Sequence, residues 1–102
     1  MKDLKSSILK GKKGLVIGIA NERSLAWGIA KSAFQHGGEL ALTYQNEALK
    51  KRLIPLADKI NSDHIYEFDI QNYEKIPVFF KKLSQEFGKL DFIVHAVAFS
   101  DK

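Results

Sequence analysis

Short apolar runs alternate along the chain with longer segments in which apolar residues recur every three or four positions. The runs at 14–19, 39–44, 64–69 and 91–97 are typical of strands, and the first is apolar enough to be buried on both faces. Between the runs, three segments predict helices because their apolar residues fall on one face. These residues are Ala26, Ile29, Ala30, Ala33 and Phe34; Leu49, Leu53, Leu56, Ala57 and Ile60; and Ile76, Phe79, Phe80, Leu83 and Phe87.

Capping residues mark where the predicted helices begin and end. Ser24 and Asn46 precede the first and second helices, and both residue types are good N-caps. Glycines at 37–38 and 88 close the first and third helices. The third helix, at about 73–87, contains Pro77, which a helix tolerates only in its first turn.

Strands that alternate with helices predict a parallel sheet of βαβ units. With right-handed crossovers, the fold class is α/β: a Rossmann-like, doubly wound sheet in the order 3-2-1-4 with three helices. The chain ends shortly after the fourth strand, so we expect a partial fold, truncated at that point. In this order the fourth strand is an edge, and residues 92–99 carry no formal charge apart from a histidine proton. An open apolar edge predicts either a covering partner or self-association of the chain.

Length and composition are those of one small globular domain. The chain has 102 residues, of which 45% are hydrophobic and 27% are charged. The formal net charge of +4 lies entirely in residues 1–13, because the remaining residues sum to zero. We therefore expect a basic N-terminal leader at 1–12, a folded domain at 13–102, and no nucleic-acid partner, which would need a basic stripe on the folded surface.

Several classes of protein are disfavoured by what the composition lacks. There are no cysteines, so disulfides, thiolate metal sites and a cysteine nucleophile are excluded. The three histidines have no ligand-like spacing, and we expect no metal site. No apolar run reaches the ~18–20 residues of a membrane span, and residues 1–13 do not form a secretory signal. A cytoplasmic protein without a membrane partner is the expectation.

The loop after the first predicted strand is the strongest candidate for a binding site. In open α/β sheets, ligands bind at the carboxyl ends of the strands. Gly18 and Ala20 are small enough for a phosphate to approach the backbone, and Ser24 opens a helix whose N-terminus attracts anions. Gly28 is expected to let this helix pack closely on the strand. The spacing alone is also compatible with an ordinary strand-to-helix loop that has a serine cap.

Three motifs, in the same order, carry a resemblance to a known family. Residues 18–26 (GIANERSLA) resemble the G-x5-S-x-A signature of bacterial NADH-dependent enoyl-acyl-carrier-protein reductases, which are divergent short-chain dehydrogenases/reductases. Residues 39–46 resemble the second strand of that family, and residues 91–102 resemble its fourth strand and the following loop. The similarity extends from about Gly11 to the last residue, so residues 13–102 are expected to form a partial dinucleotide-binding domain.

The resemblance implies an NADH cofactor and assigns residues to it. Many family members have Ser-Ile-Gly where this chain has 96–98, so only backbone contacts carry over there. Gln45 is neutral, so it can bond a ribose hydroxyl without repelling a 2′-phosphate. The implied contacts are Gly18, Ala20, Ser24 and Leu25 with the pyrophosphate, Gln45 with the adenine ribose, Asp69 and Ile70 with the adenine, and Ala96, Val97 and Ala98 with the nicotinamide-side ribose.

Family membership would also imply a reaction, the reduction of a trans-2-enoyl thioester carried by acyl carrier protein, and a homotetramer. The family's catalytic tyrosine and lysine, spaced Tyr-x6-Lys on one helix, lie beyond the fourth strand. Here Tyr44 and Lys51 match the spacing, but one ends a predicted strand and the other lies in a predicted helix. We therefore assign no catalytic residue and expect the chain, a fragment or a truncated reading frame, to be inactive alone.

Two other functions fit the residues. One is a nonenzymatic dinucleotide-binding or interaction module. The other is a short-chain dehydrogenase of different specificity, such as a ketoacyl reductase, although the T-G-x3-G-x-G turn of those enzymes is not matched.

Trp27 is expected to face away from the helix stripe, at the surface or a subunit contact. His95 is expected to be packed or hydrogen-bonded within the last strand.

Overall fold

The structure is a computed structural model that describes residues 8–20, 22–69 and 71–95. Its elements alternate as the sequence predicts, with one addition, a 3-10 turn before the last helix. In chain order they are β1 (Lys13–Ile17), α2 (Leu25–Gln35), β2 (Glu39–Tyr44), α3 (Glu47–Lys59), β3 (His64–Glu67), η1 (Tyr73–Lys75), α4 (Ile76–Glu86) and β4 (Phe92–His95).

The four strands form one parallel sheet in the order β3-β2-β1-β4. This confirms the predicted Rossmann-like topology with three α-helices. In the register, Leu15 of β1 lies beside Ala41 of β2 on one side and beside Ile93 of β4 on the other. β4 pairs only with β1, so it is an edge strand over its described residues, as predicted.

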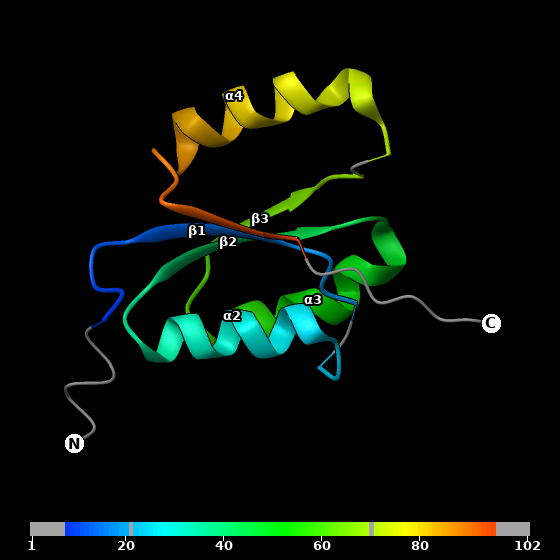
Figure 1. Cartoon of the computed structure of the whole chain (residues 1–102). Helices are drawn as coiled ribbons and strands as arrows, with labels where there is room; N and C mark the ends of the chain where they lie inside the picture. The colour runs from blue at the N-terminus through cyan, green and yellow to red at the C-terminus, as the bar shows by residue number, and fades with distance from the viewer. Residues whose placement is uncertain (1–7, 21, 70, 96–102) are drawn as a thin grey trace.

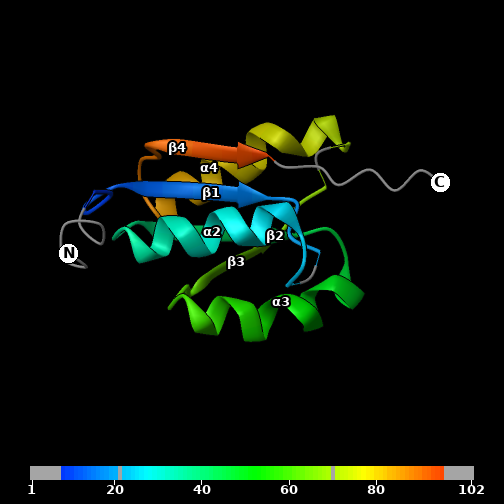
Figure 2. The same cartoon turned by 60° about the horizontal axis from the view of Figure 1, so that its bottom comes forward.

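Helices cover both faces of the sheet, with α2 and α3 on one side and α4 on the other (Figures 1 and 2). Side chains alternate along β1, so Val16 packs toward α2 and α3 while Leu15 and Ile17 pack toward α4. α2 and α3 together supply the helical side of the first core, and α4 supplies that of the second; α2 contributes Ala26, Trp27, Ala30 and Ala33. The other buried helical residues are Leu53, Leu56 and Ala57 of α3, and Phe79 and Leu83 of α4.

Lys13, at the start of β1, joins the far end of the chain to the centre of the sheet. Its backbone N–H donates to Asp91 Oδ2 at 2.8 Å, and the N–H of Asp91 returns a bond of 2.7 Å to the Lys13 carbonyl. Its Nζ donates to the carbonyl of Phe87, just past the end of α4, at 2.7 Å. A cation near the last carbonyls of a helix also interacts favourably with the helix dipole. Lys13 thus fastens both the end of α4 and the residue before β4 to the start of β1.

Gly14 lies beside Phe92 in the β1–β4 register, and the aromatic ring occupies the space where a β-carbon would be. A Cβ built on Gly14 would lie 2.0 Å from Cε2 of Phe92. The absence of a side chain therefore lets the Phe92 ring lie over β1 and pack against the core under α2.

Two expectations about α2 were wrong. Trp27 is only 4% exposed and belongs to the core cluster between the helices and the sheet. It lies three positions before Ala30, so it is about 60° around the helix from that buried residue. Gly28 is exposed, and a Cβ there would meet nothing within 4 Å. It lies two residues from both Ala26 and Ala30, which places it on the opposite side of the helix, so it is not needed for close packing.

Part of the expected leader contacts the domain. Residues 1–7 lie outside the described residues, but Leu9 donates its N–H to the carbonyl of His36 at 2.6 Å and packs against the α2–α3 core. Over the parts of the chain that the structure describes, no helix is long and apolar enough to cross a membrane.

Candidate functional site

The turn after β1 departs from extended geometry at one residue. Gly18 has a φ of +108°, a conformation that strongly favours glycine, and it is solvent-exposed. This backbone reversal ends β1 at Ile17, two residues earlier than the apolar run suggests. Ala20 follows as a small, partly buried residue. The turn therefore exposes backbone without a side chain at the carboxyl end of the strand in the middle of the sheet.

Ser24 is the N-cap of α2, as predicted. Its Oγ accepts a hydrogen bond from the N–H of Trp27 at 3.2 Å, and its own φ and ψ of −71° and 150° are extended. The first turn of α2 holds no acidic residue, so no carboxylate within it offsets the positive end of the helix dipole. Leu25 begins the helix with its side chain 67% exposed. This arrangement suits an anion placed at the start of α2.

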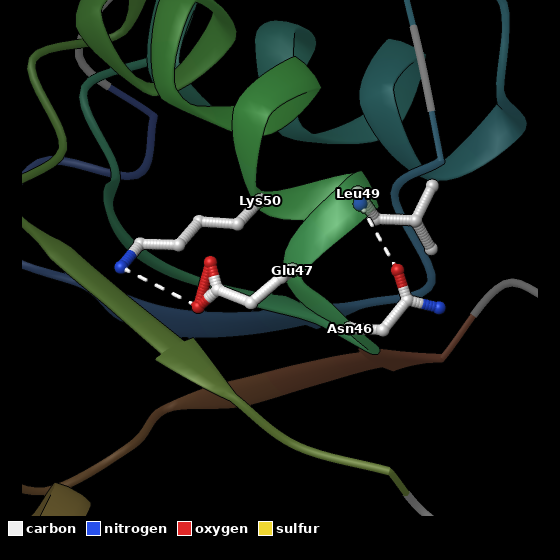
Figure 3. A network of polar contacts seen from close by, with 4 residues as sticks. All are labelled: Asn46, Glu47, Leu49 and Lys50. Atoms are coloured by element: carbon white, nitrogen blue, oxygen red, sulfur yellow. Dashed lines mark hydrogen bonds and ion pairs between the residues drawn. The ribbon is translucent and has the colours of Figure 1, made fainter.

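The turn after β2 brings a second set of polar groups to the same edge of the sheet. Tyr44 ends β2, Gln45 is exposed, and Asn46 caps α3 by accepting the N–H of Leu49 at 3.1 Å (Figure 3). Because the strands are parallel, Gln45 and the turn after β1 both follow the carboxyl ends of neighbouring strands.

The turn after β3 is held by a carboxylate. Asp69 Oδ1 accepts the N–H of Gln71 at 3.0 Å, and its carbonyl accepts the N–H of Asn72 at 2.9 Å. Asp69 also lines an open groove of about 510 Å³ between β3 and α4. The groove combines aromatic walls with charged groups. Its other lining residues are Tyr44, Ile65, Tyr66, Glu67, Phe68, Asn72, Lys75, Val78, Phe79 and Lys82.

The described part of the predicted site thus lies in three successive loops at one sheet edge. Gly18, Ala20, Ser24 and Leu25 are in the first loop and helix start, Gln45 is in the second and Asp69 in the third. The groove at Asp69 is lined by none of the described residues of the first loop, so the two features are separate. Ile70, Ala96, Val97 and Ala98, which were assigned to the adenine and the nicotinamide-side ribose, lie outside the described residues.

Comparison with known families shows which family the chain belongs to. The family model for enoyl-(acyl carrier protein) reductase matches residues 18–102. The chain belongs to this family.

Named relatives agree with the family assignment. The chain is 47% identical over 97 residues to an enoyl-[acyl-carrier-protein] reductase [NADH] of Rhizobium meliloti, covering 95% of this chain and 36% of that protein. It is 44% identical over 97 residues to the FabI reductase [NADH] of Rickettsia felis, covering 95% and 37% respectively. The chain therefore spans about a third of the length of the relatives that it matches.

Solved reductase structures share the fold. A reductase of Anaplasma phagocytophilum in complex with NAD superposes with a TM-score of 0.85 at 50% identity, covering 94% of this chain and 37% of that chain. FabI of Candidatus Liberibacter asiaticus gives a TM-score of 0.87 at 44% identity, with coverages of 94% and 37%. The resemblance stated from the three sequence motifs is confirmed.

In this reductase-family chain, the one tyrosine–lysine pair with catalytic spacing is not arranged for catalysis. Tyr44 is the last residue of β2 and is buried, whereas Lys51 is exposed in α3. The two residues cannot share a helical face, as predicted. Among the described residues, no group of three or more histidine, cysteine, aspartate or glutamate side chains could hold a metal ion. His95, the last residue of β4, is exposed rather than packed, whereas Phe92 and Val94 of the same strand pack against the core under α2.

One polar cluster was missed by sequence reasoning. The Tyr66 hydroxyl donates to Glu86 Oε1 at 3.0 Å and lies 3.1 Å from His64 Nδ1. Burial, the hydrogen bond to Glu86 and the charge of Glu86 raise the pKa of Tyr66 to about 12. The cluster joins the start of β3 to the end of α4, at the amino ends of the strands. It therefore fastens the fold at the edge opposite the candidate site.

Proposed function

We propose that the chain is the cofactor-binding half of an NADH-dependent enoyl-acyl-carrier-protein reductase of fatty-acid biosynthesis. The observation that carries the proposal is the loop after β1, which begins at Gly18 with a left-handed backbone and ends at a serine-capped helix at the carboxyl edge of the sheet. The family model begins at this same glycine.

The residues of the three loops would divide the dinucleotide between them. The exposed Gly18, the small Ala20 and the start of α2 would hold the pyrophosphate, because unpaired helix N–H groups and the dipole attract phosphate. Gln45 would bond a ribose hydroxyl, since a neutral amide both donates and accepts. Asp69 and Ile70 would flank the adenine, and residues 96–98 would line the nicotinamide-side ribose through their backbone.

NADH fits the proposal better than other cofactors because the named relatives carry the designation [NADH] and the Anaplasma phagocytophilum structure holds NAD. The bound cofactor would supply the hydride that reduces a trans-2-enoyl thioester on acyl carrier protein. The contribution of these residues is to bind and orient the dinucleotide.

We further propose that these 102 residues do not catalyse the reduction alone. Besides the Tyr44 pair, Tyr66 lies within β3, and Tyr73 is followed seven positions later by Phe80. None of these tyrosines is followed seven positions later by a lysine on the same helix, so the described residues do not supply the tyrosine–lysine pair that would stabilise an enolate oxygen. NADH oxidation with crotonyl thioester above that of a heat-inactivated sample would contradict this proposal.

Titration calorimetry of the purified chain with ADP-ribose and with NADH tests the binding proposal. The two ligands are expected to bind with similar affinity, because the described contacts lie at the adenosine and pyrophosphate end. Gly18→Val is expected to abolish binding of both, since a branched side chain disfavours a φ of +108° and would occupy the phosphate path. Gly28→Val is the matched control, because Gly28 is exposed and has open space around it. Binding of NADH about tenfold tighter than ADP-ribose (about 1.4 kcal/mol), or unchanged binding by Gly18→Val, would refute the assignment.

A further inference from the structure

The proposed adenosine site needs a group that distinguishes a ribose 2′-hydroxyl from a 2′-phosphate. In many dinucleotide sites an acidic residue after the second strand bonds the hydroxyl and repels the phosphate, whereas a basic residue attracts it. Gln45, the first residue after β2, is neutral: its amide can bond the hydroxyl, but it neither repels nor attracts the phosphate. A discriminating charge has to come from another residue, and the charged residues at the start of α3 follow Gln45 directly.

Those residues form a compact charged arrangement at the start of α3. Glu47 is the first residue of the helix, and its carboxylate lies 4.0 Å from the Nζ of Lys50, one turn later (Figure 3). The Lys50 Nζ also lies 5.7 Å from the centre of the Tyr44 ring, the last side chain of β2. Lys50 is thus the cation directed at the end of β2, and Glu47 is its partner.

Two observations make Glu47 the charged group that most affects a ligand at the start of α3: its exposure and the capping of the helix by Asn46. The Glu47 side chain is 73% exposed and that of Lys50 is 40% exposed, so the carboxylate faces solvent more openly than the amine. Asn46 Oδ1 accepts the N–H of Leu49, which removes one helix N–H that could otherwise bind a phosphate. A phosphate at the start of α3 would therefore meet the carboxylate of Glu47, with which the Lys50 amine is already paired.

We infer that Glu47 sets the cofactor preference of this site, by repelling a 2′-phosphate and by holding Lys50 in an ion pair. This inference rests on the proposed function. It assigns selectivity to a residue two positions beyond Gln45, in the first turn of the helix and not at the end of the strand.

The test compares the binding of ADP-ribose and 2′-phospho-ADP-ribose to the 102-residue chain by calorimetry at low salt. In Glu47→Gln, the affinity for the phosphorylated ligand relative to ADP-ribose is expected to rise about fivefold, because one charge close to the phosphate is removed and Lys50 is released. The effect is expected to shrink at about 1 M salt, where the Debye length is only ~3 Å. Lys50→Met should shift the ratio in the opposite direction.

Glu39→Gln is the matched control. It removes the same kind of charge, but from the amino end of β2, about 17 Å from Tyr44 at ~3.3 Å per residue. In Glu39→Gln, the affinity for 2′-phospho-ADP-ribose relative to ADP-ribose should equal that of the unmodified chain. If ADP-ribose binds and Glu47→Gln leaves the ratio unchanged, the inference is overturned while the proposed function stands. If the unmodified chain binds neither ligand, the proposed function fails and the inference fails with it.

Discussion

The close approach of Phe92 to Gly14 predicts that Gly14→Ala destabilises the chain. The added Cβ would lie 2.0, 2.2 and 2.6 Å from three ring carbons of Phe92, whereas ordinary contacts begin at 3.4 Å. The ring must therefore withdraw by about 1.4 Å, the difference between 3.4 and 2.0 Å, from the core that it packs against. Overpacking of this kind costs about 1–3 kcal/mol.

A smaller effect acts in the opposite direction. Alanine restricts the unfolded chain more than glycine does, which stabilises the folded state by about 0.5–1 kcal/mol. The expected net loss for Gly14→Ala is therefore about 1 kcal/mol in urea unfolding, within a range of about 0–2.5 kcal/mol. Fluorescence of the buried Trp27 provides the signal.

A double-mutant cycle isolates the steric contribution. In a Phe92→Val background the ring is absent, so Gly14→Ala should be neutral or slightly stabilising, with a coupling energy of at least about 1 kcal/mol. Gly28→Ala is the matched control, because Gly28 is exposed on α2 and has open space around it. It should stabilise the helix by about 0.8–1 kcal/mol. Additive effects at positions 14 and 92, within about 0.5 kcal/mol, would refute the steric argument.

Three further predictions concern other parts of the fold. Lys13→Met should cost about 1–2 kcal/mol in urea unfolding, because the Phe87 carbonyl loses a charged donor; an unchanged midpoint would contradict the role of Lys13. The pKa of Tyr66 is about 12 in the folded chain against 10.0 without the fold, so its stabilising contribution is complete below pH 10 and is lost between pH 10 and 12. Tyr66→Phe should remove that part of the pH dependence, and an identical profile would argue against it. Ile93→Lys, a charge on the exposed edge strand, should reduce the self-association that we propose for β4, as measured by light scattering; a monodisperse unmodified chain at high micromolar concentration would show that the edge does not self-associate.

The fold could be predicted well where local sequence decides it. The strand at 39–44 and the caps at Ser24 and Asn46 agree with the structure, because β-strand patterning and capping depend on a few neighbouring residues. The third strand was predicted to reach residue 69 but ends at Glu67. Glu67 lies beside Tyr44, the last residue of β2, so the partner strand stops there. The end of β3 is therefore set by the length of its partner strand and not by the sequence of β3 itself.

Features that depend on distant residues could not be predicted. The burial of Trp27 depends on the sheet that α2 packs against, since Ile29 fits the same apolar periodicity but is only partly buried. The Tyr66–Glu86 hydrogen bond joins residues 20 positions apart, and no local pattern indicates it. At the candidate site, the capped loop was predictable from residue types, whereas the Glu47–Lys50–Tyr44 arrangement required the structure.

The place of β1 between β2 and β4 has a consequence for the order in which the chain assembles. One side of β1 pairs with β2, which follows after a single βαβ crossover. The other side pairs with β4, which becomes available only after Asp91 is made, 78 residues after Lys13. During synthesis, the ~50 residues between Tyr44 and Asp91 take about 3–10 s to make at ~5–20 residues per second. Contacts of such long sequence separation also form late in folding, because loop closure must precede them. Of the two strands that pair on both sides, β1 therefore spends the longer time with one side unpaired, and during that interval the nascent chain is exposed to mispairing.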